Sequence, residues 1–556
     1  DMEIYSVSAV PYFIPDDMPV DITECIVGKG GVDILLSGEF DAESSRQRSS
    51  EKLYLYALDM CDDDSSVLSN RIYAVAETTL HQNKFTFEWH DGVSQGGIYK
   101  KYLVTAIMDG EERVVSEHVY VTNPSELASV TGDTAAADSK KGMVWDGTSL
   151  ETGGSGYVNI NVDLAKLFTL GSSDYEYIWG GKTYKFSREL INSLDSAIRS
   201  FGEDRAKIYL SLTASADGLG DASVGRVLIH PDSESGAKYS AFNTATSEGI
   251  NALAAVCEFL AGRYAGKESG GIFGVIIGEN ISNSKKNYNL GAVELTDMAE
   301  EYARALRIAY AAFRSHNSSV RVCVSLGSDW NIGYPADSKY VFDSRFTLDA
   351  LSEIIKHGGD IEWSLAFDPL PDSASFKAYD GGDSDKRMTV GNIELLIEYM
   401  KHEKLYYNGA YRKVMLIEHR RIDDVNEAEA LANAADYVYS YYRMSSQNFS
   451  YIDAYIVNRQ LSYGDVYKSV DMYTEEPGTC TMTFKGESGE EKTLTVQKVN
   501  GPAVWQGAHN KESSIRSFAK ACFQYAIDTK QDLWFSTKDT IAKIYDGQFK
   551  KVFEEE

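Results

Sequence analysis

The chain has 556 residues, of which 43% are hydrophobic and 12% aromatic, and its formal net charge is −29. This length and apolar content predict a globular protein with a large buried core and are not typical of a disordered chain. The acidic balance argues against nucleic acids and anionic membrane surfaces as partners, because both are bound by basic patches. No run of 18 apolar residues occurs, so no membrane span is predicted.

The six cysteines are scattered and have no CxxC spacing, so we predict no metal site. Nothing resembles a phosphate-binding loop, and no cofactor is expected. The chain begins at Asp1 without a methionine, which we interpret as a processed form compatible with secretion. The 36 tyrosines include candidate platforms for sugar rings, although many are expected to be ordinary core and rim residues.

Residues 1–126 predict a β-sandwich of immunoglobulin or fibronectin type. Short runs alternate between apolar and polar residues with turn residues between them, at 31–40, 83–92, 100–110 and 112–123. The following residues, 127–141, include the small and polar stretch GDTAAADSKK and are interpreted as a linker.

Residues 142–556 predict a (β/α)₈ TIM barrel. Near-continuous apolar strands that alternate with amphipathic helices indicate a parallel sheet covered by helices. The predicted strands are 142–147, 157–162, 207–214, 273–280, 321–330, 362–369, 413–420 and 452–460. The predicted helices are 188–202, 247–266, 296–315, 348–359, 390–403 and 427–444. Only about ten residues separate the first two strands, and residues 478–498 predict a β-hairpin inserted after the eighth.

Polar side chains follow the predicted strands at their carboxyl ends, where barrel enzymes carry their chemistry. They are Glu279 on strand four, Asp329 on five, Asp368 on six, Glu418 on seven, and Asn458 with Arg459 on eight. A carboxyl pair across a sugar is what glycoside hydrolysis requires, and strands four and seven face each other across a barrel. The alternative is structural, because a carboxylate at a strand end can cap the following helix.

Several stretches of the chain resemble an uncharacterised bacterial family of glycoside-hydrolase-like barrels, carried as a domain of unknown function. They include YVNINVDLAKLF, AFNTATSEG (241–249), FLAGRY (259–264), IIGEN, WNIGYP, FDPLP and MLIEH. The resemblance covers residues 95–460 and implies a relative of the clan that holds cellulases and β-galactosidases.

The resemblance also shows that the active-site strings are altered. The family's fourth strand usually ends Gly-Asn-Glu, whereas this chain has Gly278-Glu279-Asn280, so Asn280 stands at the acid/base position. The sixth strand has Asp368-Pro-Leu-Pro instead of His-Pro-Tyr-Pro. On the seventh strand Glu418 matches the nucleophile position. Since side chains alternate along a strand, Glu279 points away from the pocket unless a bulge re-aims it.

We therefore expect a secreted or cell-surface carbohydrate-active protein whose partner is an oligo- or polysaccharide and whose catalytic site is degenerate or altered. Glu418 is expected to face the barrel mouth as the nucleophile, with Glu279 or Asp368 as acid/base. Asn280, Asp329, Asn458 and Arg459 are expected to bind substrate. Candidate sugar platforms are Trp330, Tyr334 and Trp363, the last of which also suits core packing. The alternative hypothesis is an inactive glycan-binding or scaffold protein on the same fold. A third hypothesis, an acidic cation-binding barrel, rests only on the number of carboxylates.

Overall fold

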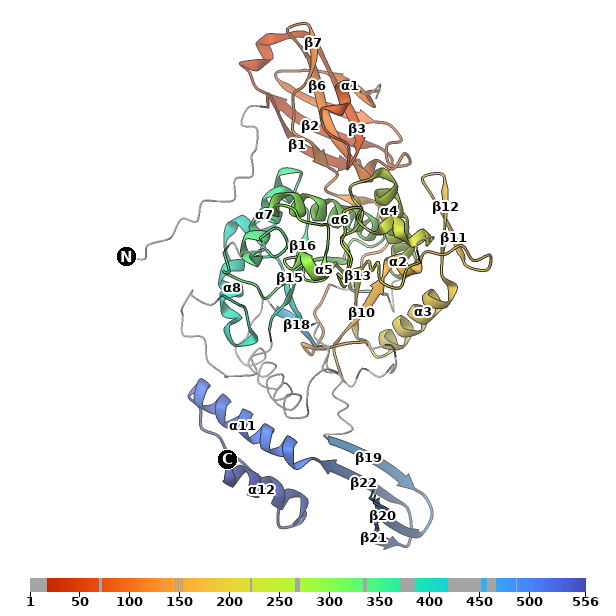
Figure 1. Ribbon diagram of the computed structural model, residues 1–556, viewed down its shortest axis with the longest axis vertical. Helices are drawn as coiled ribbons and strands as arrows, with labels where there is room; N and C mark the ends of the chain where they lie inside the picture. The colour runs from red at the N-terminus through yellow and green to blue at the C-terminus, as the bar shows by residue number, and fades with distance from the viewer. Residues whose placement is uncertain are drawn as a thin grey trace. The chain divides into compact units, whose positions relative to one another are not determined.

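The computed structural model describes residues 18–69, 73–132, 134–145, 147, 150, 152, 154–220, 223–265, 271–333, 338–370, 386–418, 452–457, 467–486 and 488–556. The described residues fall into two compact units, unit 1 at 18–457 and unit 2 at 467–556. The predicted barrel domain runs to residue 556, whereas the described residues from 467 onward belong to unit 2 (Figure 1).

Unit 1 begins with two antiparallel sheets. The first has the order β1 (Val20–Val27), β2 (Ile34–Phe40), β5 (Lys84–Trp89). The second has the order β4 (Ala76–Thr79), β3 (Arg48–Asp59), β6 (Lys100–Met108), β7 (Glu111–Val114), with β8 (Val119–Tyr120) paired to β6. Short helical turns lie at η1 (Ser44–Gln47), α1 (Ser66–Ser69), η2 (Gly97–Tyr99) and η3 (Pro124–Leu127).

Alternating residues form the core of these sheets. In β5 every second side chain is buried, as the period-two pattern of its sequence predicts. Leu36 and Phe87 of one sheet and Leu53 of the other are fully buried. The rings of Trp89 and Tyr102, one from each sheet, meet edge to face with 6.2 Å between their centroids.

The rest of unit 1 is a closed barrel of eight parallel strands, which confirms the predicted TIM-like fold. The strands are β9 (Lys141–Val144), β10 (Tyr157–Asp163), β13 (Lys207–Thr213), β14 (Gly274–Ile277), β15 (Arg321–Gly327), β16 (Trp363–Asp368), β17 (Val414–Glu418) and β18 (Ile452–Val457). Each pairs with the next in this order, and β18 closes on β9.

Helices follow most of the strands, as predicted. They are α2 (Leu164–Leu167), α3 (Arg188–Glu203), α4 (Ser247–Leu260), α5 (Ser284–Asn287), α6 (Leu295–His316), α7 (Ser344–His357) and α8 (Glu394–Met400). Short turns add η4 (Val224–Leu228), the π-helical η5 (Ala261–Ala265), η6 (Val390–Asn392) and η7 (Glu403–Leu405). An unpredicted hairpin, β11 (Tyr175–Trp179) with β12 (Lys182–Phe186), precedes α3. The predicted helix at 427–444 lies outside the described residues.

The register of the strands defines which side chains point into the barrel. One buried cluster takes residues from seven of the strands: Tyr157, Tyr209, Phe273, Ile276, Cys323, Ala366, Met415, Ile417, Ala454 and Ile456. These positions are linked by direct pairing across neighbouring strands, so they mark the inward face. Large aromatic rings fill the amino-terminal end of the barrel, where Arg321 also pairs with Asp453.

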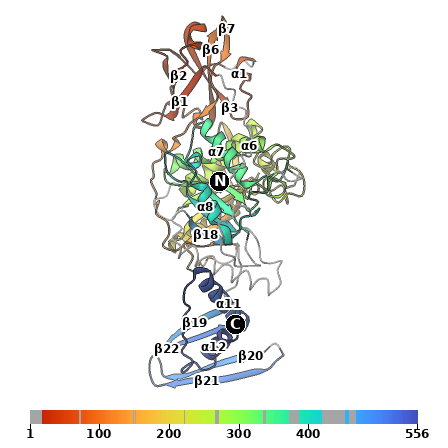
Figure 2. The ribbon, with the colours of Figure 1, turned by 90° about the vertical axis from the view of Figure 1, so that its left-hand side faces the viewer.

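The N-terminal sheets dock on the barrel through α4, α6 and α7, and Figures 1 and 2 both show α6 and α7 on the side facing those sheets. The carboxylate of Glu258 on α4 accepts a hydrogen bond from the Tyr99 hydroxyl and pairs with His316 Nε2 at 2.8 Å. The Tyr120 amide donates to the carbonyl of Gly358 at 2.9 Å. Buried polar contacts of this kind fix one docking geometry.

Among its described residues, unit 2 contains two antiparallel strand pairs and two helices. Strand β19 (Tyr467–Thr474) pairs with β22 (Ala503–Asn510), and β20 (Gly478–Lys485) pairs with β21 (Glu491–Val499) at the predicted hairpin. Helices α11 (Glu512–Thr529) and α12 (Tyr545–Glu555) pack through Ile515, Ala519, Val552 and Phe553. Among the helices of the described ranges, none combines the length and apolarity that crossing a membrane requires.

Candidate functional site at the barrel mouth

Polar side chains replace apolar ones toward the carboxyl end of the barrel interior. On β10 the inward residues after Tyr157 are Asn159 and Asn161, and each faces an inward hydroxyl of β13. Ser211 Oγ donates to Asn159 Oδ1 at 2.9 Å, and Thr213 Oγ1 donates to Asn161 Oδ1 at 3.1 Å. The interior therefore changes from an aromatic base to a hydrogen-bonded upper part.

The mouth, defined as the inward-facing groups at the carboxyl ends of the strands, is open to solvent. Asn161 points into the barrel and is nevertheless exposed. Its Nδ2 donates to the hydroxyl of Tyr239 at 2.8 Å. Asp163, the next inward residue, accepts from the Ser215 amide at 3.1 Å and pairs with Lys166 at 3.3 Å. Burial raises the pKa of Asp163 above its ordinary value.

Glu279 lies at the mouth because the backbone around it is irregular. Strand β14 ends at Ile277, and the next residues include Gly278 with φ +70° and Asn280 with φ +41°. Two left-handed residues interrupt the simple alternation that would turn Glu279 outward. Its side chain is buried, and Oε1 is 2.6 Å from Lys238 Nζ, on the loop after β13.

Lys238 connects two of the predicted catalytic carboxylates. Burial opposes its charge, but the nearby Glu279 and, more weakly, Asp368 raise the pKa of Lys238. Asp368 pairs in register with Gly327 and follows the inward residue Ala366 by two, so it faces the barrel interior. The structure thus brings Glu279 and Asp368 into one electrostatic environment around an ammonium group. In the ion pair Glu279 is an acceptor of hydrogen bonds.

Asn280, which stands at the acid/base position of the resembling family, also faces inward. A Cβ added to the inward residue Gly327 would lie 2.1 Å from the Asn280 amide, so that amide occupies the space above Gly327. The side-chain oxygen of Asn280 accepts from Ser282 Oγ at 2.9 Å, and its backbone amide donates to Ser325 Oγ at 2.9 Å. An amide held in this way offers no acidic proton.

Glu418 does not face the mouth, which corrects the expectation for the nucleophile. Ile417, its neighbour, belongs to the inward cluster, and alternation places Glu418 on the opposite face with Leu416. Leu416 pairs in register with Tyr455, whose hydroxyl donates a hydrogen bond to Glu418. Glu418 is itself buried.

The remaining predicted binding residues have mixed positions. Asp329 pairs with Arg387, with Oδ1 3.3 Å from Nε. Trp330 is only 2% exposed and packs edge to face on Phe367 and Tyr399, so it is a core residue and not an exposed sugar platform. Trp363 is likewise buried in the core, as its alternative role predicted. Tyr334, Asn458 and Arg459 lie outside the described residues.

The mouth also contains four residues that the sequence does not predict as site residues: Lys238, Tyr239, Asn161 and Asp163. For the two β10 residues a signal exists: YVNINVD places polar residues at every second position of a buried strand, which marks a polar inward face. For Lys238 and Tyr239 the only signal is their proximity to the stretch AFNTATSEG on a long loop after the third barrel strand. Pattern periodicity does not place loop residues, so this pair requires a structure.

Among the described residues one group has metal-ligand spacing, formed by Asp33, Glu88 and His90 at the N-terminal sheets. Two of the three are exposed, and exposed acidic groups are common without an ion. It is remote in sequence from the mouth, and we assign it no function.

The fold and the mouth define an α/β-barrel protein with an inward-facing polar site that includes the Glu279–Lys238 carboxylate–ammonium pair. The chain belongs to a family of unknown function, DUF5722, whose model matches residues 133–470. This match covers the barrel and confirms the expected uncharacterised domain family.

A shorter part of the chain is similar to curated enzymes. It is 41% identical over 103 residues to an isocitrate dehydrogenase [NADP] of Sphingobium yanoikuyae, covering 18% of this chain and 25% of that enzyme. It is 42% identical over 95 residues to the mitochondrial isocitrate dehydrogenase [NADP] of Homo sapiens, covering 17% and 21%. The chain therefore spans a quarter or less of the length of these relatives.

Proposed function

We propose that the barrel binds oligo- or polysaccharides on a glycoside-hydrolase-like scaffold whose hydrolytic site is degenerate. One observation carries the proposal: the inward position that requires an acid holds Asn280, while Glu418 lies on the outer face with Tyr455. A hydrolase of this type needs two carboxyl groups facing one sugar. The polar mouth departs from that arrangement at the two positions that the resemblance assigns to the carboxyl pair.

The mouth suits a ligand rich in hydroxyl groups. Asn161 and Tyr239 offer both donors and acceptors, Glu279 offers acceptors, and Lys238 offers donors. Sugar hydroxyls need donors and acceptors in close alternation, which is what these four side chains present. Because Trp330 is buried, the proposed sugar binding relies on hydrogen bonds and not on stacking against that ring.

A weak hydrolase is the second form of the same proposal, and Asp368 supports it. Asp368 is half-buried, faces inward, and shares the field of Lys238 with Glu279. If these two carboxyl groups act, hydrolysis would favour aryl glycosides, whose leaving groups need little protonation. Loss of general acid assistance reduces a rate by about 10²–10⁴-fold.

Two wider expectations also belong to this proposal. A secreted or cell-surface location fits a polysaccharide partner. The two N-terminal sheets fit a sandwich of immunoglobulin or fibronectin type, because buried alternating residues from both meet at Trp89 and Tyr102.

We further infer that the dehydrogenase-like stretch is the C-terminal part of the chain. The family model ends at residue 470, and the matched lengths of 94–103 residues are close to the 98 residues from 459 to 556 that separate as unit 2. Only a quarter of the enzyme's length is shared, so its activity is not proposed for this chain.

Binding is tested by titrating the full chain with a panel of neutral oligosaccharides in a calorimeter. Asn161→Ala and Tyr239→Phe each remove a mouth hydrogen bond, and we expect about tenfold weaker binding for each. Tyr175→Phe is the matched control, because its hydroxyl bonds Asn192 on α3 away from the mouth. Equal affinity of all four proteins for every ligand bound would refute the site.

Hydrolysis is tested with aryl and natural glycosides on wild type, Asp368→Asn, Glu418→Gln and Asn280→Glu. We expect weak or absent turnover of natural substrates, loss of any residual aryl activity in Asp368→Asn, and little change in Glu418→Gln. Robust turnover of a natural oligosaccharide by the wild type would refute the degenerate site.

A further inference from the structure

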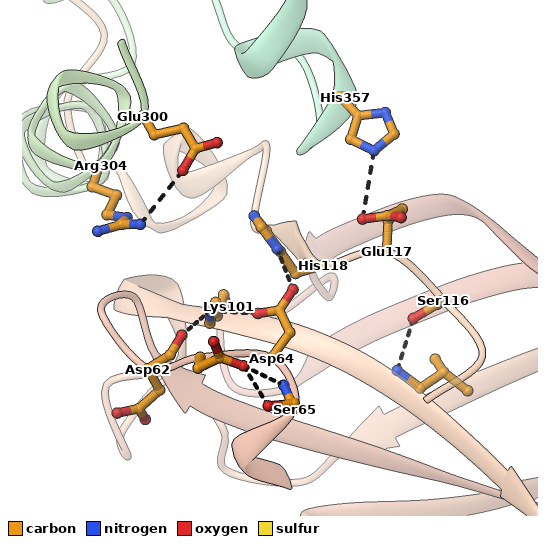
Figure 3. Close-up of polar contacts among 12 residues, drawn as sticks. Asp62, Asp64, Ser65, Lys101, Ser116, Glu117, His118, Glu300, Arg304 and His357 are labelled. Carbon is orange, nitrogen blue, oxygen red and sulfur yellow. Dashed lines mark hydrogen bonds and ion pairs between the residues drawn. The ribbon is translucent and has the colours of Figure 1, made fainter. Parts of the chain in front are cut away.

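A small cavity lies between the N-terminal sheets and the barrel, away from the mouth. Its volume is about 40 Å³. Five of its lining residues are cations or become cations on protonation: Lys101 and His118 from the N-terminal sheets, Arg304 and Arg307 from α6, and His357 from α7. Figure 3 shows four of these side chains, with the acidic residues that contact them.

The composition of the wall is opposite to that of the chain. The protein has 83 acidic and 54 basic residues, yet Glu300 is the single carboxylate that lines this cavity among the described residues. Glu300 pairs with Arg304 of the same wall, with Oε2 3.9 Å from Nη2, and burial raises the pKa of Glu300 above its ordinary value. Cationic groups therefore outnumber carboxylates on this wall.

Other carboxylates, which do not line the cavity, contact the cationic side chains and orient them. Asp64 accepts from Lys101 Nζ and lies 2.7 Å from His118 Nδ1. Although burial opposes it, the hydrogen bond with His118 and the charge of Lys101 lower the pKa of Asp64 to about 2. On the barrel side, Arg304 Nη1 bonds Glu301 at 2.8 Å.

His357 completes this frame across the boundary between the sheets and the barrel. Its Nε2 lies 3.9 Å from Glu117, on the loop before β8, and this contact raises the pKa of His357. The cationic side chains are thus oriented by neighbours from both parts of unit 1.

Arg307 gives an independent indication of a missing acceptor. The residue is only 5% exposed, and Nη2 donates to the carbonyls of Ile355 at 2.7 Å and Gly359 at 2.9 Å. Its Nη1 is buried without a hydrogen-bond partner within the described ranges. Burial lowers the pKa of Arg307 to about 10, but the group remains charged at neutral pH. A buried guanidinium with an unused donor is rare unless a water or an anion accepts from it.

We propose that this cavity binds one small inorganic oxyanion, of the phosphate or sulfate class. The volume holds about three waters, and a tetrahedral oxyanion of five heavy atoms replaces such a group. Its oxygens provide acceptors in several directions, which suits lysine and arginine donors that converge from different elements. The anion would join the N-terminal sheets to α6 and α7.

The test is calorimetric titration of the full chain with inorganic phosphate and with sulfate at constant pH and ionic strength, with chloride as the reference. We expect one saturable site per chain for phosphate or sulfate. The thermal unfolding midpoint is expected to rise with phosphate concentration, because the anion binds the folded state. Absence of saturable binding for both anions would refute the proposal, and so would binding limited to larger phosphate esters.

Variants locate the site. Arg304→Gln removes a lining cation and is expected to weaken phosphate binding about 10- to 100-fold, the range for a hydrogen bond to a charged group. Arg314→Gln is the matched control on the same helix, where Arg314 pairs with Glu362 instead of lining the cavity. Lys238→Met tests whether the anion binds at the mouth. Both controls are expected to bind phosphate as the wild type does.

Folding of Arg304→Gln is checked first by its circular dichroism spectrum and by its unfolding midpoint without phosphate. If that variant fails to fold, His357→Gln replaces it, since His357 is part-exposed on α7 and lines the same cavity. Unchanged phosphate affinity in a folded lining variant would refute the site, as would loss of binding in Lys238→Met.

Discussion

The Glu279–Lys238 pair is expected to stabilise the barrel more than a surface ion pair does. Its atoms are 2.6 Å apart, and the carboxylate side chain is 8% exposed whereas the lysine side chain is 49% exposed. Breaking a fully buried pair costs about 3–5 kcal/mol, and an exposed pair contributes about 0–1 kcal/mol. For a pair with one half-exposed partner we expect a coupling free energy of about 1–3 kcal/mol between these limits.

A double-mutant cycle measures this coupling. The wild type, Lys238→Met, Glu279→Gln and the double variant are unfolded in urea, and the transition of unit 1 is followed by circular dichroism. Lys182 and Glu248 provide the control cycle: their atoms are 2.8 Å apart, but the side chains are 54% and 68% exposed. We expect less than about 1 kcal/mol there. Equal coupling free energies in the two cycles would refute the argument from burial.

The same pair predicts a dependence on alkaline pH. Because the folded-state pKa of Lys238 is raised, its contribution to stability is fully present below the ordinary lysine value of about 10.4. The contribution is lost as the pH rises through the higher folded-state pKa. Lys238→Arg, which keeps its charge at those pH values, is expected to retain stability where the wild type loses it.

Three further predictions concern the mouth, the docking surface and the base of the barrel. Gly327→Ala is expected to lower the free energy of unfolding by about 1–3 kcal/mol, because the new Cβ meets the Asn280 amide at 2.1 Å. Adding Asn280→Gly should restore the free energy of unfolding measured in urea, and a failure to restore it would contradict this clash. The raised pKa of His357 predicts extra stability that is present below pH about 6.5 and is lost as the pH rises through the folded-state pKa. The free energy of unfolding should therefore be larger at acid than at alkaline pH in the wild type, and this extra stability should be absent from His357→Gln. Arg321→Met should destabilise the barrel by about 3–5 kcal/mol, since it leaves buried Asp453 without its close guanidinium partner; calorimetry that shows an unchanged unfolding midpoint would contradict this.

The barrel was predictable from sequence because its strands are nearly continuous apolar runs. Segments such as GVII (274–277) and VMLIE (414–418) are buried on both faces, and only a strand covered on both sides needs that composition. The segments between the strands are amphipathic, and this pattern indicates helices that cover the sheet on one face. The boundaries were less accurate, because a strand such as β14 ends where Gly278 and Asn280 turn left-handed, and no periodicity signals that turn.

The site was less predictable because a one-residue difference decides which face a side chain takes. Glu418 and Asp368 both end apolar runs, yet the pairing register turns Asp368 inward and Glu418 outward. The partner of Glu279 is Lys238, 41 residues earlier on a loop. Neither the register nor a loop contact at that separation can be read from local pattern.

The shared carboxylate of Glu258 has a consequence for how the chain is made. Tyr99 precedes Glu258 by 159 residues, so a ribosome that adds about 5–20 residues per second exposes the two groups about 8–30 s apart. The N-terminal sheets have strand pairs that are complete before Glu258 emerges, and they can close first. Their docking surface then stays in contact with water until α4 and α6 form. The barrel helices can therefore assemble against N-terminal sheets that have already formed.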